Sequence, residues 1–84
     1  MEIFVVYIVY SAAVDKYYVG YTVDIKKRLV EHNTGISTYT AKATDWELKF
    51  AREFMSRKEA MSEERRIKAK KSRKYIEWLI SSVG

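Results

Sequence analysis

The chain of 84 residues contains no cysteine, no proline and a single histidine. Without cysteine it can form neither a disulfide nor a thiolate metal site. A single histidine without cysteine also excludes a zinc cage, so a bound metal would depend mainly on oxygen ligands. The absence of proline leaves no obvious linker, and we expect residues 1–84 to form one domain.

Long apolar runs are also absent. No stretch approaches the length of a membrane span. The first residues lack the basic region, apolar run and small-residue cleavage site of a signal peptide, so we expect a cytoplasmic protein. Hydrophobic residues nevertheless make up 48% of the chain, which favours a packed globule over disorder.

The net charge of +5 is unevenly distributed along the chain. Residues 1–34 balance to zero, and residues 35–84 carry the whole excess. Seven cations and no acid lie between positions 65 and 74, namely Arg65, Arg66, Lys68, Lys70, Lys71, Arg73 and Lys74. A run of this density repels itself unless an anionic partner compensates it. Two interpretations stay open, a nucleic-acid-binding surface and a solvated helix face that keeps the protein soluble.

The apolar patterns predict three strands. Residues 3–10 are almost continuously apolar, β-branched and aromatic, which is typical of a central strand covered on both faces. Residues 17–21 form a second short strand, and the turn-like stretch 11–16 makes an antiparallel hairpin the simplest connection. A third strand follows, where Trp46, Leu48 and Phe50 alternate with polar residues and predict one solvated face.

Three helices complete the expected order ββαβαα. Thr22 or Asp24 can cap the first helix. The segment 56–59 is a capping box, Ser-Arg-Lys-Glu, and predicts the start of a second helix that continues to about Lys71. A third helix can begin at Ser72. The fold class expected from this order is α+β, with a small sheet covered by helices.

Two residues of the first helix could take part in chemistry. Arg28 and His32 are four positions apart and therefore lie on one helix face. The arginine could equally be the ion-pair partner of Asp24 or Glu31. The histidine could equally be a surface residue or one with its hydrogen bonds satisfied. On spacing alone, both alternatives stay open.

A carboxylate of the second helix has an unusual position. Helical geometry places Glu64 in one narrow sector with Ile67 and Lys71, while Glu63 points to one side. A carboxylate on a stripe that faces a sheet costs free energy unless it is paired or coordinated. It could serve a functional site, form a salt bridge with Lys68 or Lys71, or pair with an arginine from elsewhere.

Taken together and in order, these residues resemble the GIY-YIG nuclease family. Tyr18-Val19-Gly20 matches Tyr-Ile-Gly, and Val5-Val6-Tyr7 stands where the family has Gly-Ile-Tyr. Arg28 follows that glycine by eight residues and His32 by twelve. Further stretches resemble the small single-domain bacterial members: 26–29, 31–35, Tyr39-Thr40, 46–48 and 56–74. The chain departs from the family at Val5, which replaces the first glycine, and in having no asparagine after Glu64, where the larger homing-type nucleases carry one.

The resemblance implies a three-stranded antiparallel sheet flanked by helices and a metal-dependent endonuclease that hydrolyses DNA. It assigns Glu64 as the only protein ligand of Mg²⁺ (or Mn²⁺), with Glu63 as the alternative one residue away. It assigns Arg28 to the scissile phosphate, and Tyr7 as general base or water-positioning residue. A phenol titrates near pH 10, so a nearby cation would have to lower the pKa of Tyr7. Tyr18 and His32 would orient water or phosphate.

The same resemblance implies partners. The seven cations of residues 65–74 would contact phosphates, which position a nucleic acid without reading its sequence. We expect weakly specific or structure-selective recognition of branched, nicked or single-stranded DNA, as in DNA repair, with a protein partner able to supply specificity. The alternative function is a catalytically weak or inactive nucleic-acid-binding or adaptor module on the same fold.

Overall fold

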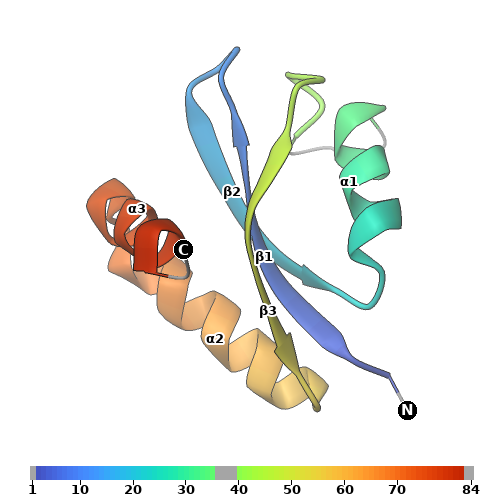
Figure 1. The fold of residues 1–84 in the computed structure, drawn as a ribbon, viewed down its shortest axis with the longest axis vertical. Helices are drawn as coiled ribbons and strands as arrows, with labels where there is room; N and C mark the ends of the chain where they lie inside the picture. The colour runs from blue at the N-terminus through green and yellow to red at the C-terminus, as the bar shows by residue number, and fades with distance from the viewer. Residues whose placement is uncertain (1, 36–39, 83–84) are drawn as a thin grey trace.

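The computed structural model describes residues 2–35 and 40–82. Within them, the elements in chain order are β1 (Phe4–Ser11), β2 (Lys16–Thr22), α1 (Ile25–Asn33), β3 (Glu47–Phe54), α2 (Arg57–Lys70) and α3 (Arg73–Ser82) (Figure 1). The predicted α+β class and the order ββαβαα are confirmed. None of the helices in this part of the chain has the length and apolar character needed to cross a membrane.

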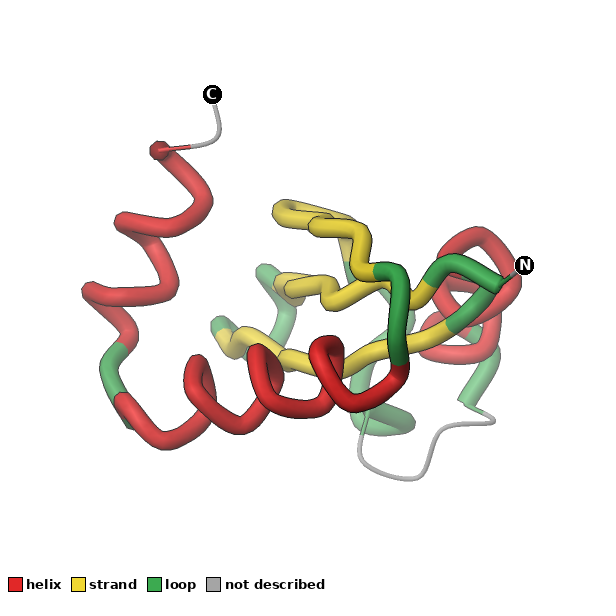
Figure 2. Tube along the Cα trace, turned by 90° about the horizontal axis from the view of Figure 1, so that it is seen from below, coloured by secondary structure: helices red, strands yellow, loops and turns green. Residues whose placement is uncertain are grey.

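The three strands form one antiparallel sheet in the order β2-β1-β3. β1 is the central strand because its side chains are apolar on both faces, and Phe4 to Val9 are all buried. Its side chains alternate between two clusters. Val6 and Ile8 pack in a core under α2 and α3, whereas Tyr7 and Val9 pack on the side of α1. Figures 1 and 2 show α1 on one side of the sheet and the α2–α3 pair on the other.

β3 departs from the simple alternation that its sequence predicts. The register between β1 and β3 shifts by one residue, so that Val9 pairs with Leu48 and Lys49 is the extra residue of a bulge. Phe50 therefore packs under α2 and α3, while Trp46 packs on the α1 side. Leu48 is 40% exposed. The third strand is confirmed, but the prediction that these three apolar residues share one face was wrong, because the bulge reverses the alternation.

The helix ends follow the predicted capping residues. Asp24 caps α1 and accepts a hydrogen bond from a backbone N–H of its first turn. Ser56 caps α2 by accepting from the backbone N–H of Glu59. α2 ends where Lys71 adopts a left-handed conformation with φ of 48°, and the Ser72 hydroxyl then accepts a hydrogen bond from the first turn of α3. This break turns α3 away from the direction of α2 (Figure 2).

Candidate active site

Two tyrosines lie side by side on the α1 side of the sheet. Tyr7, on the central strand, pairs with Gly20, and Tyr18 pairs with Val9, so the tyrosines are diagonal neighbours on one face. Their ring centroids are 6.4 Å apart. The hairpin register thus brings the two aromatic residues of the sequence motifs together.

Gly20 makes space for this arrangement. A Cβ atom at this position would lie 2.7 Å from the hydroxyl oxygen of Tyr7 and 3.1 Å from the ring of Tyr18. Such a contact is far shorter than van der Waals distance, so any side chain here would displace a tyrosine. The glycine of the Tyr-Val-Gly motif is therefore needed for a close approach to the Tyr7 ring.

His32 is completely buried in the last turn of α1 and has a partner at each ring nitrogen. Nε2 lies 2.8 Å from the Tyr7 hydroxyl, and Nδ1 lies 2.6 Å from the hydroxyl of Thr40, which is also fully buried. The indole N–H of Trp46 donates to the Thr40 carbonyl oxygen at 2.9 Å. The imidazole is thus held in a continuous network that includes the Tyr7 hydroxyl.

The protonation states in this network follow from burial. Burial, with a smaller contribution from the positive charge of Arg28, lowers the pKa of His32, so its imidazole is neutral at neutral pH. Burial also raises the pKa of Tyr7 to about 12, against the opposing effect of Arg28. Arg28 therefore does not lower the pKa of Tyr7 below its ordinary value of 10. A neutral imidazole has one donor and one acceptor nitrogen, so if Tyr7 donates to Nε2, then Nδ1–H donates to Thr40.

Arg28 projects from α1 beside the tyrosines, and its side chain is 30% exposed. Its Nη1 lies 2.9 Å from a carboxylate oxygen of Glu31, so one of the pairings left open by the sequence is present. This ion pair raises the pKa of Arg28. A guanidinium has five N–H donors, and the pairing leaves some of them for another anion. Arg28 borders a hollow of about 310 Å³, also lined by Thr22, Val23, Asp24, Lys27 and Glu31.

Glu64 lies on the flank of α2 that is near these residues. Its carboxylate is 3.7 Å from Nζ of Lys68, and that ammonium lies 5.7 Å from the ring centroid of Tyr18. The negative charge of Glu64 also contributes to the raised pKa of Tyr7. The salt bridge to Lys68 that the sequence left open is therefore present, and it lies beside the tyrosines.

Glu63 lies on the opposite flank of the buried stripe formed by Ala60 and Ile67. It accepts two hydrogen bonds from the guanidinium of Arg66, at 2.9 and 2.7 Å, and it is 3.8 Å from the guanidinium of Arg52 on β3. Arg66 lowers the pKa of Glu63. The Glu63 side chain is 11% exposed and the Glu64 side chain 19%, so both acids border the buried stripe. Glu63 thus forms a structural ion pair with Arg66, and Glu64 is the acid on the side of the tyrosines.

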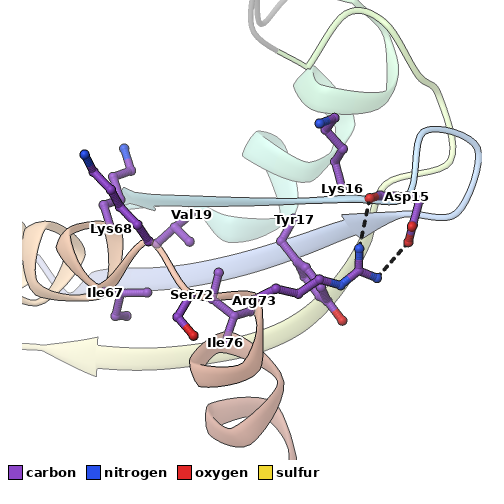
Figure 3. Close-up of a pocket in the computed structure, with 10 residues that line it drawn as sticks. Asp15, Lys16, Tyr17, Val19, Ile67, Lys68, Ser72, Arg73 and Ile76 are labelled. Carbon is purple, nitrogen blue, oxygen red and sulfur yellow. Dashed lines mark hydrogen bonds and ion pairs between the residues drawn. The ribbon is translucent and has the colours of Figure 1, made fainter.

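The seven cations of residues 65–74 are all exposed, but they do not share one face. Lys68, Lys71 and Arg73 line a pocket of about 320 Å³ with Lys16 of β2 (Figure 3). Arg73 is paired within the molecule, at 2.7 Å to Asp15 and 3.2 Å to Glu77.

The remaining cations point elsewhere. Arg66 is paired with Glu63, and Lys70 lies 5.4 Å from the ring centroid of Tyr75. Arg65 lines a separate hollow on the outer side of α2. Lys74 is exposed in the first turn of α3. The helical turn of α2 and the break between α2 and α3 together divide one continuous run in the sequence among several surfaces.

Two residues that contribute to this site belong to the sequence motifs but have no role assigned by the resemblance. Thr40 positions the far side of His32, and the side chain of Asn33 exchanges two hydrogen bonds with the backbone of Trp46, at 2.7 and 3.0 Å. The only signal for Thr40 was its place beside Tyr39 in the resemblance, and Tyr39 itself lies outside the described residues.

Comparison with known proteins identifies the class to which this fold and this cluster belong. Residues 3–76 match the family model described as the GIY-YIG catalytic domain, which is the domain of nuclease-type hydrolases acting on nucleic acid. The chain belongs to the GIY-YIG family. No solved structure matches it at a significant level.

Small proteins of two distant organisms are similar to the chain. It is 42% identical over 64 residues to the UPF0213 protein of Streptococcus pneumoniae serotype 4, covering 75% of this chain and 65% of that protein. It is 45% identical over 53 residues to a UPF0213 protein of Halobacterium salinarum, covering 62% of this chain and 69% of that one. The chain therefore spans slightly less than two thirds of the length of the streptococcal relative.

Proposed function

We propose that this protein is a metal-dependent endonuclease that hydrolyses phosphodiester bonds in DNA with little sequence specificity. The observation that carries the proposal is the convergence of two tyrosines, a buried histidine, an arginine and one carboxylate at a single place. Tyr7, Tyr18 and His32 make contact with one another, and the charges of Arg28 and Glu64 both act on Tyr7.

Tyr7 is well suited to accept a proton from water, provided that its own proton can leave. Its pKa of about 12 means that it is a neutral phenol at neutral pH. Its hydroxyl, however, lies 2.8 Å from Nε2 of His32. As a water attacks phosphorus, the bond from phosphorus to the leaving sugar oxygen breaks. Tyr7 can take the proton of that water while it passes its own proton to Nε2 of His32, and the leaving oxygen takes a proton from solvent. Nδ1–H donates to Thr40 throughout, so a free phenolate is not required.

Negative charge develops on the phosphate oxygens as the water adds. Arg28 is partly exposed next to Tyr7, and a guanidinium can donate two parallel hydrogen bonds to a phosphate. Lys68, between Glu64 and Tyr18, adds a second positive charge at the β2 side. Preorganised cations of this kind act mainly on the transition state, where the charge is greatest.

The residues present fit magnesium better than a soft metal. The described residues contain no group of three or more His, Asp or Glu side chains that could hold an ion. Glu64 is a partly exposed oxygen donor, and one carboxylate suffices for Mg²⁺ when waters and substrate phosphate complete its shell. A bound Mg²⁺ or Mn²⁺ would supply Lewis acidity at the phosphate.

The test compares Glu64→Gln with Glu63→Gln, which is the same change on the opposite flank of α2. Purified proteins are incubated with branched, nicked and single-stranded DNA in Mg²⁺ and in Mn²⁺. We expect Glu64→Gln to lower the cleavage rate by about a hundredfold or more, as expected for losing charge stabilisation at a transition state. Glu63→Gln should retain most of the rate, because its pairing with Arg66 is structural.

Three outcomes would contradict parts of the proposal. Cleavage by Glu64→Gln at the parental rate would remove this carboxylate from the site. Loss of cleavage only in Glu63→Gln would move the metal ligand by one residue. Salt-sensitive DNA binding by the parent without cleavage of any substrate would favour the nucleic-acid-binding or adaptor module.

A further inference from the structure

α3 exposes a large aromatic side chain on the side of the sheet opposite the tyrosine site. Trp78 is 59% exposed, and its ring is stacked near that of Tyr75, with centroids 5.9 Å apart and planes inclined by 26°. The other tryptophan of the chain, Trp46, is only 2% exposed and its indole N–H is hydrogen-bonded to Thr40. Core packing thus accounts for Trp46 but leaves most of the Trp78 surface in contact with solvent.

The two stacked rings form one wall of a groove of about 700 Å³. The other walls come from the middle of β3 and from α2. Besides Tyr75 and Trp78, the lining residues are Phe50, Ala51, Arg52, Arg66, Leu79 and Ser82. The lining residues belong to β3, α2 and α3, and Figures 1 and 2 show α2 and α3 on the side of the sheet away from α1. The groove is therefore separate from the candidate active site.

The charges around this groove are positive in sum, because Arg52, Arg66 and Lys70 outnumber Glu63, the acid that faces both arginines. Arg52 and Arg66 line the groove, with side chains 61% and 50% exposed, and no acidic residue is among the described residues that line it. Lys70 adds a third cation, 5.4 Å from the ring centroid of Tyr75. Arg66 is held in place, because it donates to Glu63 on one side and to the Tyr75 hydroxyl, at 2.8 Å, on the other.

We infer that this groove binds a single-stranded segment of nucleic acid, as a second contact beyond the proposed catalytic site. A base would stack on the exposed face of Trp78, and the neighbouring phosphates would lie near Arg52 and Lys70. Exposed aromatic rings beside cations are the combination that binds single strands without sequence preference, since every base has a π face. The bases of a duplex are stacked on one another, so an intact duplex cannot use Trp78 in this way. The choice of nucleic acid as ligand rests on the proposed function.

The groove is less suited to a second copy of this chain or to an apolar peptide. Glu63 is paired with Arg66 and lies 3.8 Å from Arg52, so one carboxylate faces two arginines of the groove. A second copy or an apolar peptide would also bring Lys70, beside Tyr75, into the interface, and positive charge would then remain in excess there. Burying positive charges that outnumber their acidic partners is costly, whereas a phosphate backbone compensates them and releases counterions. The charge therefore favours an anionic chain with planar groups.

The experiment measures binding in EDTA, where cleavage cannot contribute. A labelled thymidine oligonucleotide and a hairpin duplex are titrated by fluorescence anisotropy, and tryptophan emission is recorded in parallel. We expect the single strand to quench the exposed Trp78. Trp78→Ala should weaken single-strand binding by roughly five- to a hundredfold, which corresponds to the loss of one stacked base. Duplex binding should change less than about twofold, and Trp78→Phe should retain most of the single-strand affinity.

Met55→Ala is the matched control, because Met55 is also largely exposed, at 63%, but lies outside the groove. Unchanged single-strand affinity of folded Trp78→Ala would overturn the inference. So would a parent protein that sediments as a dimer while Trp78→Ala is a monomer, since the groove would then join two copies. If Trp78→Ala does not fold, absence of quenching in the parent overturns the inference by itself.

The same titrations separate this inference from the proposed function. If the parent cleaves DNA in Mg²⁺ but Trp78→Ala binds single strands normally, only the groove is wrong. If the parent binds no nucleic acid and cleaves none, the proposed function fails together with the groove.

Discussion

The two faces of the sheet differ in what they bury. The face toward α2 and α3 buries an apolar core in which Val6, Ile8, Ile67 and Leu79 pack together. The face toward α1 buries hydroxyls and an imidazole, and the buried polar residues among those described are Ser11, His32 and Thr40. Each of these three is hydrogen-bonded, and no buried side-chain nitrogen or oxygen in this part of the chain lacks a partner.

One strand serves both faces, because β1 directs its side chains alternately to either side. Burying apolar surface provides most of the free energy of folding. A network of buried polar groups adds little net stability, but it holds groups of defined geometry and shifted pKa. The comparison indicates that the α2–α3 side mainly stabilises the domain and that the α1 side mainly positions reactive groups.

The largest expected effects come from one substitution on each face. Tyr7→Phe removes a single hydroxyl, and we expect cleavage to fall by about a hundredfold or more. The free energy of unfolding of Tyr7→Phe should decrease by only about 1–3 kcal/mol, because Nε2 of His32 loses its hydrogen-bond partner. Ile67→Ala should lower the free energy of unfolding by about 2–5 kcal/mol, because Ile67 is 1% exposed in the core. At a temperature where it is folded, Ile67→Ala should cleave at close to the parental rate.

Urea denaturation and initial cleavage rates, measured on the same preparations, check this pair. A large loss of activity in folded Ile67→Ala would mean that the two faces are coupled, and the division of roles would fail.

A smaller effect is expected at Gly20, where the two strands of the hairpin support the tyrosines. Gly20→Ala places a methyl group 2.7 Å from the Tyr7 hydroxyl oxygen, so we expect displacement of that ring. Overpacking of this kind lowers the free energy of unfolding by about 1–3 kcal/mol, and the cleavage rate should fall as well. Gly35→Ala is the control, because its φ of 81° strains an alanine by about 1–2 kcal/mol although nothing lies within 4 Å. A Gly20→Ala protein with full activity would show that the tyrosine position is not critical.

The smallest effect concerns acid stability. The pKa of His32 lies below its ordinary value of 6.5 because the imidazole is buried. Just below pH 6.5 the unfolded chain therefore binds a proton that the folded protein does not, and the free energy of unfolding should decrease as the pH falls through this window. His32 is the single histidine of the sequence, so the effect can be assigned.

Thermal unfolding at pH 7.5 and 5.5, together with an NMR titration of the imidazole, checks this prediction. Asp15 does not interfere, because its pKa is lowered from 3.8 to about 2 by Arg73 and its contribution is lost only at more acidic pH. An imidazole that titrates at or above 6.5 would contradict the prediction.

Much of the fold was predictable because its determinants are local. The apolar run of β1, the turn before β2 and the capping residues Asp24 and Ser56 act within a few positions along the chain. The bulge at Lys49 was not predictable, because it depends on how β3 pairs with β1. The pairing of Tyr7 with Gly20 follows from the hairpin register, which a short turn largely determines.

The sequence by itself determined the elements, their order, and the spacing of Tyr7, Tyr18, Arg28 and His32, since periodicity and capping are short-range effects. Only the tertiary structure decided which partners these residues meet. The loop residue Thr40 reaches His32 through packing of Trp46, and the buried stripe of α2 directs Glu63 toward Arg52 and Glu64 toward the tyrosines. Burial then raises the pKa of Tyr7 and lowers that of His32. These properties depend on contacts between residues far apart in the chain, and a local sequence pattern does not predict such contacts.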